Sequence, residues 1–130
     1  MATENLDGIY SYPAAADYRT NQYQFVTVNS AGRAALSAIG TLPDGLLHNA
    51  PNAYTVAGAE PARVVSKRGV VVKVRLGGPV AIGDPMASGA TGLAVTSATS
   101  THIIIGKFLQ AGVSGDIVMA LYTGYSTVVP

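Results

Sequence analysis

The chain has 130 residues, and its 8 basic and 7 acidic residues give a formal net charge of +1. Charged residues make up 12% of the chain, about half of the roughly 25% typical of soluble domains, whereas 48% are apolar. This composition excludes a highly charged disordered tail, and the lack of cysteine excludes a disulfide-stapled fold, a cysteine zinc site and a thiol enzyme.

A chain of this length is expected to form one domain with its own core, yet its surface carries few charges for a monomer. Its first residues include two carboxylates and no apolar run, so we expect no signal peptide. The longest apolar runs are far shorter than the ~20 residues that cross a bilayer. We therefore expect no membrane partner, and we expect a protein that buries surface against itself or another protein.

The first 22 residues show neither the two-residue period of a strand nor the 3.6-residue period of a helix. Their tyrosines favour an extended arm that docks on another surface, because an aromatic side chain buries a large area. A flexible terminus is the alternative interpretation. We predict an arm over residues 1–22 and a single β-rich domain over residues 23–130. The candidate contact residues of the arm are Ile9, Tyr10, Tyr12 and Tyr18.

The next segment begins with aromatic and β-branched residues and becomes rich in turn residues. Residues 23–28 are predicted to form a strand that ends at a turn over residues 29–32. Residues 33–39 fit either a short strand or a helical turn. Residues 40–59 carry Gly, Pro and Asn and are predicted to form a long loop, with one helical turn at residues 46–47.

The second half alternates short apolar segments with Gly, Pro and Asp turns. Lys67 to Gly69 is a turn candidate, and Asp84 and Asp116 suit turn positions, where a carboxylate accepts hydrogen bonds from nearby backbone. This spacing predicts an all-β barrel or sandwich without long helices. The expected strands cover residues 62–66, 70–76, 80–82, 93–96, 102–109 and 117–122.

Two stretches of the sequence resemble each other, residues 29–38 and residues 89–98. The matched residues are Gly32, Ala34, Ser37 and Ala38 in the first stretch and Gly92, Ala94, Ser97 and Ala98 in the second. Both stretches fit a strand, a glycine turn and a returning strand. We interpret them as two similar hairpins.

The sequence offers no arrangement of catalytic, metal-binding or cofactor-binding residues. No Gly-x-Ser-x-Gly motif marks a nucleophile, and His48 and His102 lie too far apart in sequence to form a spaced ligand pair. Gly106 and Lys107 lack the flanking residues of a phosphate-binding loop. We therefore expect no catalytic residue, no metal and no cofactor.

The basic residues are unevenly distributed. Five of the eight, with no acidic residue among them, fall between residues 63 and 75: Arg63, Lys67, Arg68, Lys73 and Arg75. They predict a positive patch that meets an acidic surface or phosphates, or a solvated strand that resists edge pairing. The stretch lacks interleaved aromatic residues and the net charge is low, so nucleic acid is the less favoured partner.

Four short motifs follow one another in the second half. They are Gly-Asp-Pro at residues 83–85, Thr-Gly-Leu-Ala at 91–94, Ile-Gly-Lys-Phe-Leu at 105–109 and Gly-Asp-Ile-Val-Met-Ala-Leu at 115–121. In this order they resemble the small capsid decoration, or cement, proteins of tailed bacteriophages. The resemblance covers about residues 60 to 122, and it does not include the tyrosine-rich start or the insertion at residues 40–59.

The resemblance implies a small β-barrel or β-tulip-like domain, commonly a homotrimer, that binds the outside of a mature phage head. It implies a non-enzymatic virion protein, made in the host bacterial cytoplasm, whose partner is the major capsid protein. The N-terminal arm and the basic patch would then be the surfaces that contact the capsid. Two alternatives stay open: a nucleic-acid-binding barrel that uses residues 63–75, and another β-rich subunit of the virion or tail.

Overall fold

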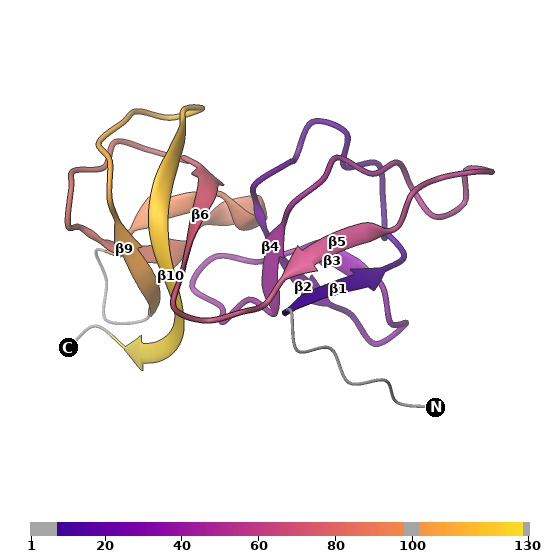
Figure 1. Ribbon diagram of the computed structural model, residues 1–130, viewed down its shortest axis with the longest axis horizontal. Coiled ribbons are helices and arrows are strands. Elements are labelled where there is room, and N and C mark those ends of the chain that lie inside the picture. Colours follow the sequence, from indigo (N-terminus) through magenta and orange to yellow (C-terminus); the bar gives the residue numbers. More distant parts are fainter. Residues whose placement is uncertain (1–7, 98–101, 129–130) are drawn as a thin grey trace.

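The computed structural model describes residues 8–97 and 102–128, with side chains for residues 8–97 and 102–123. These residues form ten β-strands and one short 3-10 helix in two antiparallel five-stranded sheets, and the predicted all-β fold is confirmed. Figure 1 shows the two sheets as lobes lying side by side. Among these residues, no helix is long and apolar enough to cross a membrane.

The first sheet defines unit one, residues 8–65. Its strands are β1 (Ile9–Tyr12), β2 (Phe25–Val28), β3 (Ala34–Leu36), β4 (Gly45–Leu47) and β5 (Ala62–Val65), in the spatial order β1-β5-β4-β2-β3. Asn29 shapes the predicted turn between β2 and β3, because its Oδ1 accepts hydrogen bonds from the N–H groups of Ala31 and Arg33, each at 3.0 Å.

The second sheet defines unit two, residues 70–128. Its elements are β6 (Val70–Arg75), β7 (Pro85–Ser88), the 3-10 helix η1 (Ala90–Gly92), β8 (Ala94–Thr96), β9 (Ile103–Phe108) and β10 (Ile117–Val128), with the strand order β6-β10-β9-β7-β8. Asp84 and Asp116 are turn residues, as predicted. Their carboxylates accept hydrogen bonds from the N–H groups of Ala81, at 2.9 Å, and Val113, at 3.0 Å.

The two units share one topology. Strands β6 to β10 occupy the same places in the sheet of unit two as β1 to β5 occupy, in chain order, in the sheet of unit one. The registers agree as well. Val28 pairs with Ala34 in unit one, and Ser88 pairs with Ala94 in unit two, so both partners are displaced by 60 residues. The similarity between residues 29–38 and 89–98 is therefore one part of a repeat that spans both units.

Hydrogen bonds repeat at equivalent places in the two units. The amide oxygen of Asn49 accepts a bond from the Arg63 N–H at 2.9 Å, and the amide oxygen of Gln110 accepts one from the Met119 N–H at 2.9 Å. In each unit, this bond holds the loop after the fourth strand against the fifth strand. The repeat thus includes side-chain interactions and not only the strand order.

Each sheet curls until its first strand approaches its third. In unit one, Ala14 forms a parallel bridge with Ala34, and in unit two Leu76 forms one with Ala94. Each five-stranded sheet is therefore closed at one end, and the inward side chains form a core. The core of unit one includes Val26, Leu47, Ala62 and Val64, and the equivalent positions of unit two are Met86, Phe108, Val118 and Ala120.

The core of unit two also receives side chains from unit one. Phe25 and Leu46 point away from their own core and belong to the buried cluster of unit two, with exposed fractions of 0% and 1%. Gly92 packs so closely on the backbone of Phe25 that a Cβ atom there would collide with the Phe25 carbonyl. The chain is therefore two repeated units, in which one core cluster is made by unit one alone and the other by residues of both units. Residues 66–69 connect β5 to β6.

The predicted arm over residues 1–22 is wrong for the part that the structure describes. Residues 9–12 form β1, which pairs with β5, and Ala14 and Tyr18 are buried in the core of unit one. Tyr18 is part of this core and Tyr12 packs against it, so the predicted boundary between residues 22 and 23 falls inside unit one. Residues 1–7 of the predicted arm lie outside the described residues.

Two further predictions of local structure are wrong. Residues 46–47 belong to strand β4 and not to a helical turn, because Leu46 and Leu47 pair with Val65 and Val64 of β5. Residues 80–82 contribute only an isolated bridge, between Val80 and Gly112, whereas β7 forms just after the Gly-Asp-Pro turn. Both errors concern strands of at most four residues, which are too short to show a period.

Candidate binding groove between the two units

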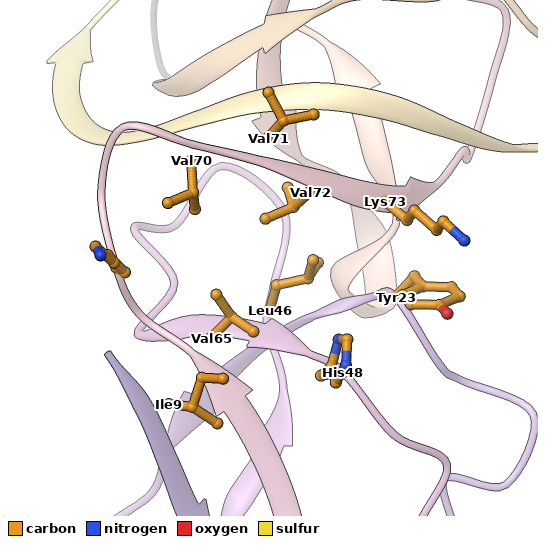
Figure 2. A pocket seen from close by; sticks show the side chains of 10 residues that line it. Ile9, Tyr23, Leu46, His48, Val65, Val70, Val71, Val72 and Lys73 are labelled. Atoms are coloured by element: carbon orange, nitrogen blue, oxygen red, sulfur yellow. The ribbon is translucent and has the colours of Figure 1, made fainter. Parts of the chain in front are cut away.

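A groove of about 390 Å³ lies between unit one and β6 of unit two. Its floor is apolar, with Leu46 and Val65 on the side of unit one and Val70 and Val72 on the side of unit two (Figure 2). The other lining residues are Ile9, Tyr23, His48, Lys67, Val71 and Lys73. Among the described residues, none that lines it is acidic.

Strand β6 forms one wall of the groove and presents an edge to it. The Leu76 N–H donates to the Asp116 carbonyl beside β10, at 2.8 Å, whereas the Arg75 N–H donates to the Tyr23 carbonyl of unit one, at 2.9 Å. Because successive residues of a strand point their N–H groups to opposite sides, Val71 and Lys73 direct theirs away from β10. The groove thus combines apolar side chains with the backbone of a strand edge.

Two lysines and two aromatic rings surround the mouth of the groove. Lys67 comes from the turn between the units and Lys73 from β6, and both are exposed. The rings of Tyr23 and His48 meet edge to face, with centroids 6.4 Å apart. A basic rim over an apolar floor favours ligands or protein segments that combine carboxylates with apolar side chains.

The structure brings together only part of the predicted basic patch. Lys67 and Lys73 line the groove, whereas Arg63 and Arg68 are exposed but do not line it. Arg75 is half-buried, and its Nε donates to the Gln22 carbonyl at 3.3 Å, which ties β6 to unit one. The patch is therefore divided between a groove rim, a solvated surface and a structural contact.

The predicted contact residues of the arm are divided as well. Ile9 is 43% exposed and lines the groove, and Tyr10 is half-buried on β1. Tyr12 packs against the core of unit one, and Tyr18 is only 7% exposed within it. A buried side chain cannot meet a partner in the folded protein, so Tyr18 is wrong as a contact residue.

The polar groups of the described residues do not gather into a reactive arrangement. His48 stands at the mouth of the groove beside Tyr23, whereas the half-buried His102 precedes β9 in unit two. Residues 8–97 and 102–128 contain no group of three or more His, Asp or Glu residues that could hold a metal ion. The groove is therefore described as a surface that is suited to binding.

Sequence reasoning missed the contribution of β4 to the groove. Leu46 lies within the predicted long loop, and its place on a strand facing unit two depends on β5, which follows much later in the chain. A signal does exist: Gly45 followed by apolar Leu46 and Leu47 corresponds to Gly106, Lys107 and Phe108 in the repeat.

Together, the fold and the groove define an all-β protein made of two repeated five-stranded units, with a basic-rimmed apolar groove between them. No protein-family profile and no curated protein matches the chain. The fold is similar to that of the N base of head fiber gp8.5 of bacteriophage phi29, with a TM-score of 0.72 over 92% of this chain and 96% of that chain. The sequence identity is 14%, so the likeness concerns the fold.

Proposed function

We propose that this chain is a structural protein of a bacteriophage virion that binds the outer surface of the head as a decoration or cement protein. The observation that carries the proposal is the fold likeness to a phage head-fiber base, which extends over 92% of this chain. The order of the four sequence motifs supports the same class independently. The partner in this proposal is the major capsid protein, and the protein binds it as a homotrimer.

A decoration protein needs a binding surface and no chemistry, and the groove supplies the first. Lys67 and Lys73 flank its apolar floor, so an acidic segment of the capsid surface with an apolar side chain would fit both parts. Modest contacts suffice for this role, because they are repeated at many identical sites of the shell and because linked copies bind with avidity.

The experiment that tests this proposal mixes the purified protein with expanded shells of its own phage. We expect the protein to co-sediment with the shells and to raise their rupture temperature. Replacing both Lys67→Gln and Lys73→Gln should weaken binding, whereas the double variant Arg19→Gln and Arg33→Gln, which removes the same charge outside the groove, should bind normally. No binding to shells by the folded wild-type protein would overturn the proposal.

A salt titration against DNA distinguishes the nucleic-acid alternative. Binding to phosphates weakens steeply as salt rises, because counterions are released when the protein binds. We expect no such binding, since only two of the five clustered basic residues line the groove and its floor is apolar.

A further inference from the structure

The outer edge of β6 is open where it borders the groove. The residue just after the strand, Leu76, donates its N–H to the Asp116 carbonyl beside β10, so alternate residues of β6 bond in that direction. Val71 and Lys73 direct their N–H and C=O groups to the other side, toward the groove. In the part of the chain that the structure describes, no backbone group bonds to them on that side.

The same edge is already paired at its far end. The Arg75 N–H donates to the Tyr23 carbonyl at 2.9 Å, and Tyr23 belongs to unit one and lines the groove. Backbone beside β6 therefore reaches hydrogen-bond distance of its outer edge. Lys73 and Val71 are the next positions along this edge, and the groove lies beside both.

The two faces of β6 give such an added chain different neighbours. Val70 and Val72 are half-buried and point toward Val65 across the groove (Figure 2). Val71 and Lys73 lie on the opposite face and are exposed. Side chains directly opposite each other on neighbouring strands share a face. An added strand would therefore place every second side chain over the apolar floor and the others beside Lys73.

The size of the groove fits a short extended segment. One strand residue takes up about 160 Å³, from a rise of about 3.3 Å, a strand spacing of about 4.8 Å and a sheet separation of about 10 Å. The groove of about 390 Å³ therefore holds roughly two or three such residues. This length matches the open part of the edge, from Val71 to Lys73.

We propose that the groove takes an extended segment of the partner protein as an added antiparallel strand on β6, a segment in which apolar and acidic side chains alternate. Backbone hydrogen bonds to Val71 and Lys73 would hold it, and antiparallel pairing matches the rest of the sheet. Its apolar side chains would cover Val72 and the groove floor, and a carboxylate would lie opposite Lys73.

Charge complementarity selects this chemistry, because Lys67 and Lys73 line the groove and none of the described residues that line it is acidic. The inference deepens the proposed function, on which the identity of the partner as the major capsid protein rests. The chemistry of the segment depends on the groove alone, so it can be tested without shells.

Amide hydrogen exchange followed by NMR tests the edge and its occupant. In the isolated protein, the amides of Val71 and Lys73 should exchange faster than those of Val72 and Val74, which face β10. The blocked peptide Val-Glu-Val-Glu-Val should slow exchange at Val71 and Lys73 and shift their resonances. The peptide Val-Lys-Val-Lys-Val is the charge control and should not bind. Equal exchange at all four amides, or equal binding of the two peptides, would overturn the proposal.

Two variants separate backbone pairing from side-chain contact. Val71→Pro removes the outward N–H and keeps the bonds to β10, since proline is tolerated on the free side of an edge strand. Val71→Ala also removes the valine side chain but keeps the N–H. We expect Val71→Pro to bind the glutamate peptide about fivefold more weakly than Val71→Ala, the factor for one lost hydrogen bond. Equal affinities of the two folded variants would contradict pairing with β6.

Modified peptides give the same comparison without changing the protein, which covers the case in which Val71→Pro does not fold. In an antiparallel strand with a glutamate opposite Lys73, the glutamate N–H groups face β6 and the valine N–H groups face away. Methylation of the glutamate nitrogens should therefore abolish binding, whereas methylation of the valine nitrogens should preserve it. Equal affinities of the two methylated peptides would refute the added strand. Shell binding by a wild-type protein that does not bind the glutamate peptide would overturn this inference and leave the proposed function standing.

Discussion

Phe25 of unit one and Tyr122 of unit two pack with their ring centroids 6.1 Å apart and their planes inclined by 44°. Both side chains are almost fully buried, at 0% and 2% exposed. Through this contact the last strand of unit two depends on the second strand of unit one. We therefore expect the two units to unfold in one cooperative transition.

Phe25→Ala should destabilise the whole chain by about 3–5 kcal/mol, because it leaves a cavity in the core that both units share. Urea unfolding followed by far-UV circular dichroism measures this loss. Tyr54→Ala, at a residue 43% exposed, is the control and should have a small effect. Two separate unfolding transitions in the variant would show that the units are independent.

Gly106→Ala and Gly45→Ala should each destabilise the protein by about 1–3 kcal/mol, the range for forcing extra atoms into a packed site. A Cβ atom at Gly106 would collide with the Leu121 carbonyl, and one at Gly45 would lie 2.6 Å from the Val65 carbonyl. Gly78→Ala is the control, because a Cβ there meets no atom within 4 Å. Equal melting temperatures for all three variants would contradict the close strand approach.

Removal of residues 1–20 should prevent unit one from folding, because it deletes β1 and the buried Tyr18. The single change Tyr18→Ala should by itself cost about 3 kcal/mol. Thermal unfolding of the soluble protein measures both effects. A truncated protein with a wild-type melting curve would restore the interpretation of this segment as a separate arm.

Tyr122 should make the protein sensitive to alkaline pH. Burial raises the pKa of its hydroxyl above the ordinary value of 10.0, while the charge of Arg68 lowers the pKa and that of Asp44 raises it. A raised pKa in the folded state means that this contribution to stability is fully present below pH 10 and is lost as the pH rises through the folded pKa.

Tyr122→Phe should therefore lose less stability than the wild-type protein between neutral pH and pH values above 10. Urea unfolding at a series of pH values, with Tyr54→Phe as the matched control, gives the comparison. Parallel losses in all three proteins would assign the alkaline sensitivity to other groups.

Strong local patterns in the sequence predicted the parts of the fold that do not depend on distant partners. The alternation of Val70, Val72 and Val74 with Val71 and Lys73 identified β6 and its buried side, and the structure confirms both. The Gly-Asp turns were also recognisable, since their carboxylates bond to backbone only three residues away.

Features that depend on pairing between residues far apart in the chain could not be predicted from the sequence. β1 exists because residues 9–12 pair with β5, about fifty residues later, and its own residues have no strand period. The extent of the repeat was missed for a similar reason. Equivalent positions keep a backbone register and a burial state, as at Leu47 and Phe108, while the residues themselves have changed.

The burial of Phe25 and Leu46 under unit two has a consequence for the order of events during synthesis. All five strands of unit one leave the ribosome before β6, so this unit can fold while its outer face still has no cover. An apolar surface exposed at this stage promotes aggregation of nascent chains. The connection of four residues after β5 brings only β6 to this face early, and the cover is completed by β10, the last strand, since Tyr122 packs on Phe25.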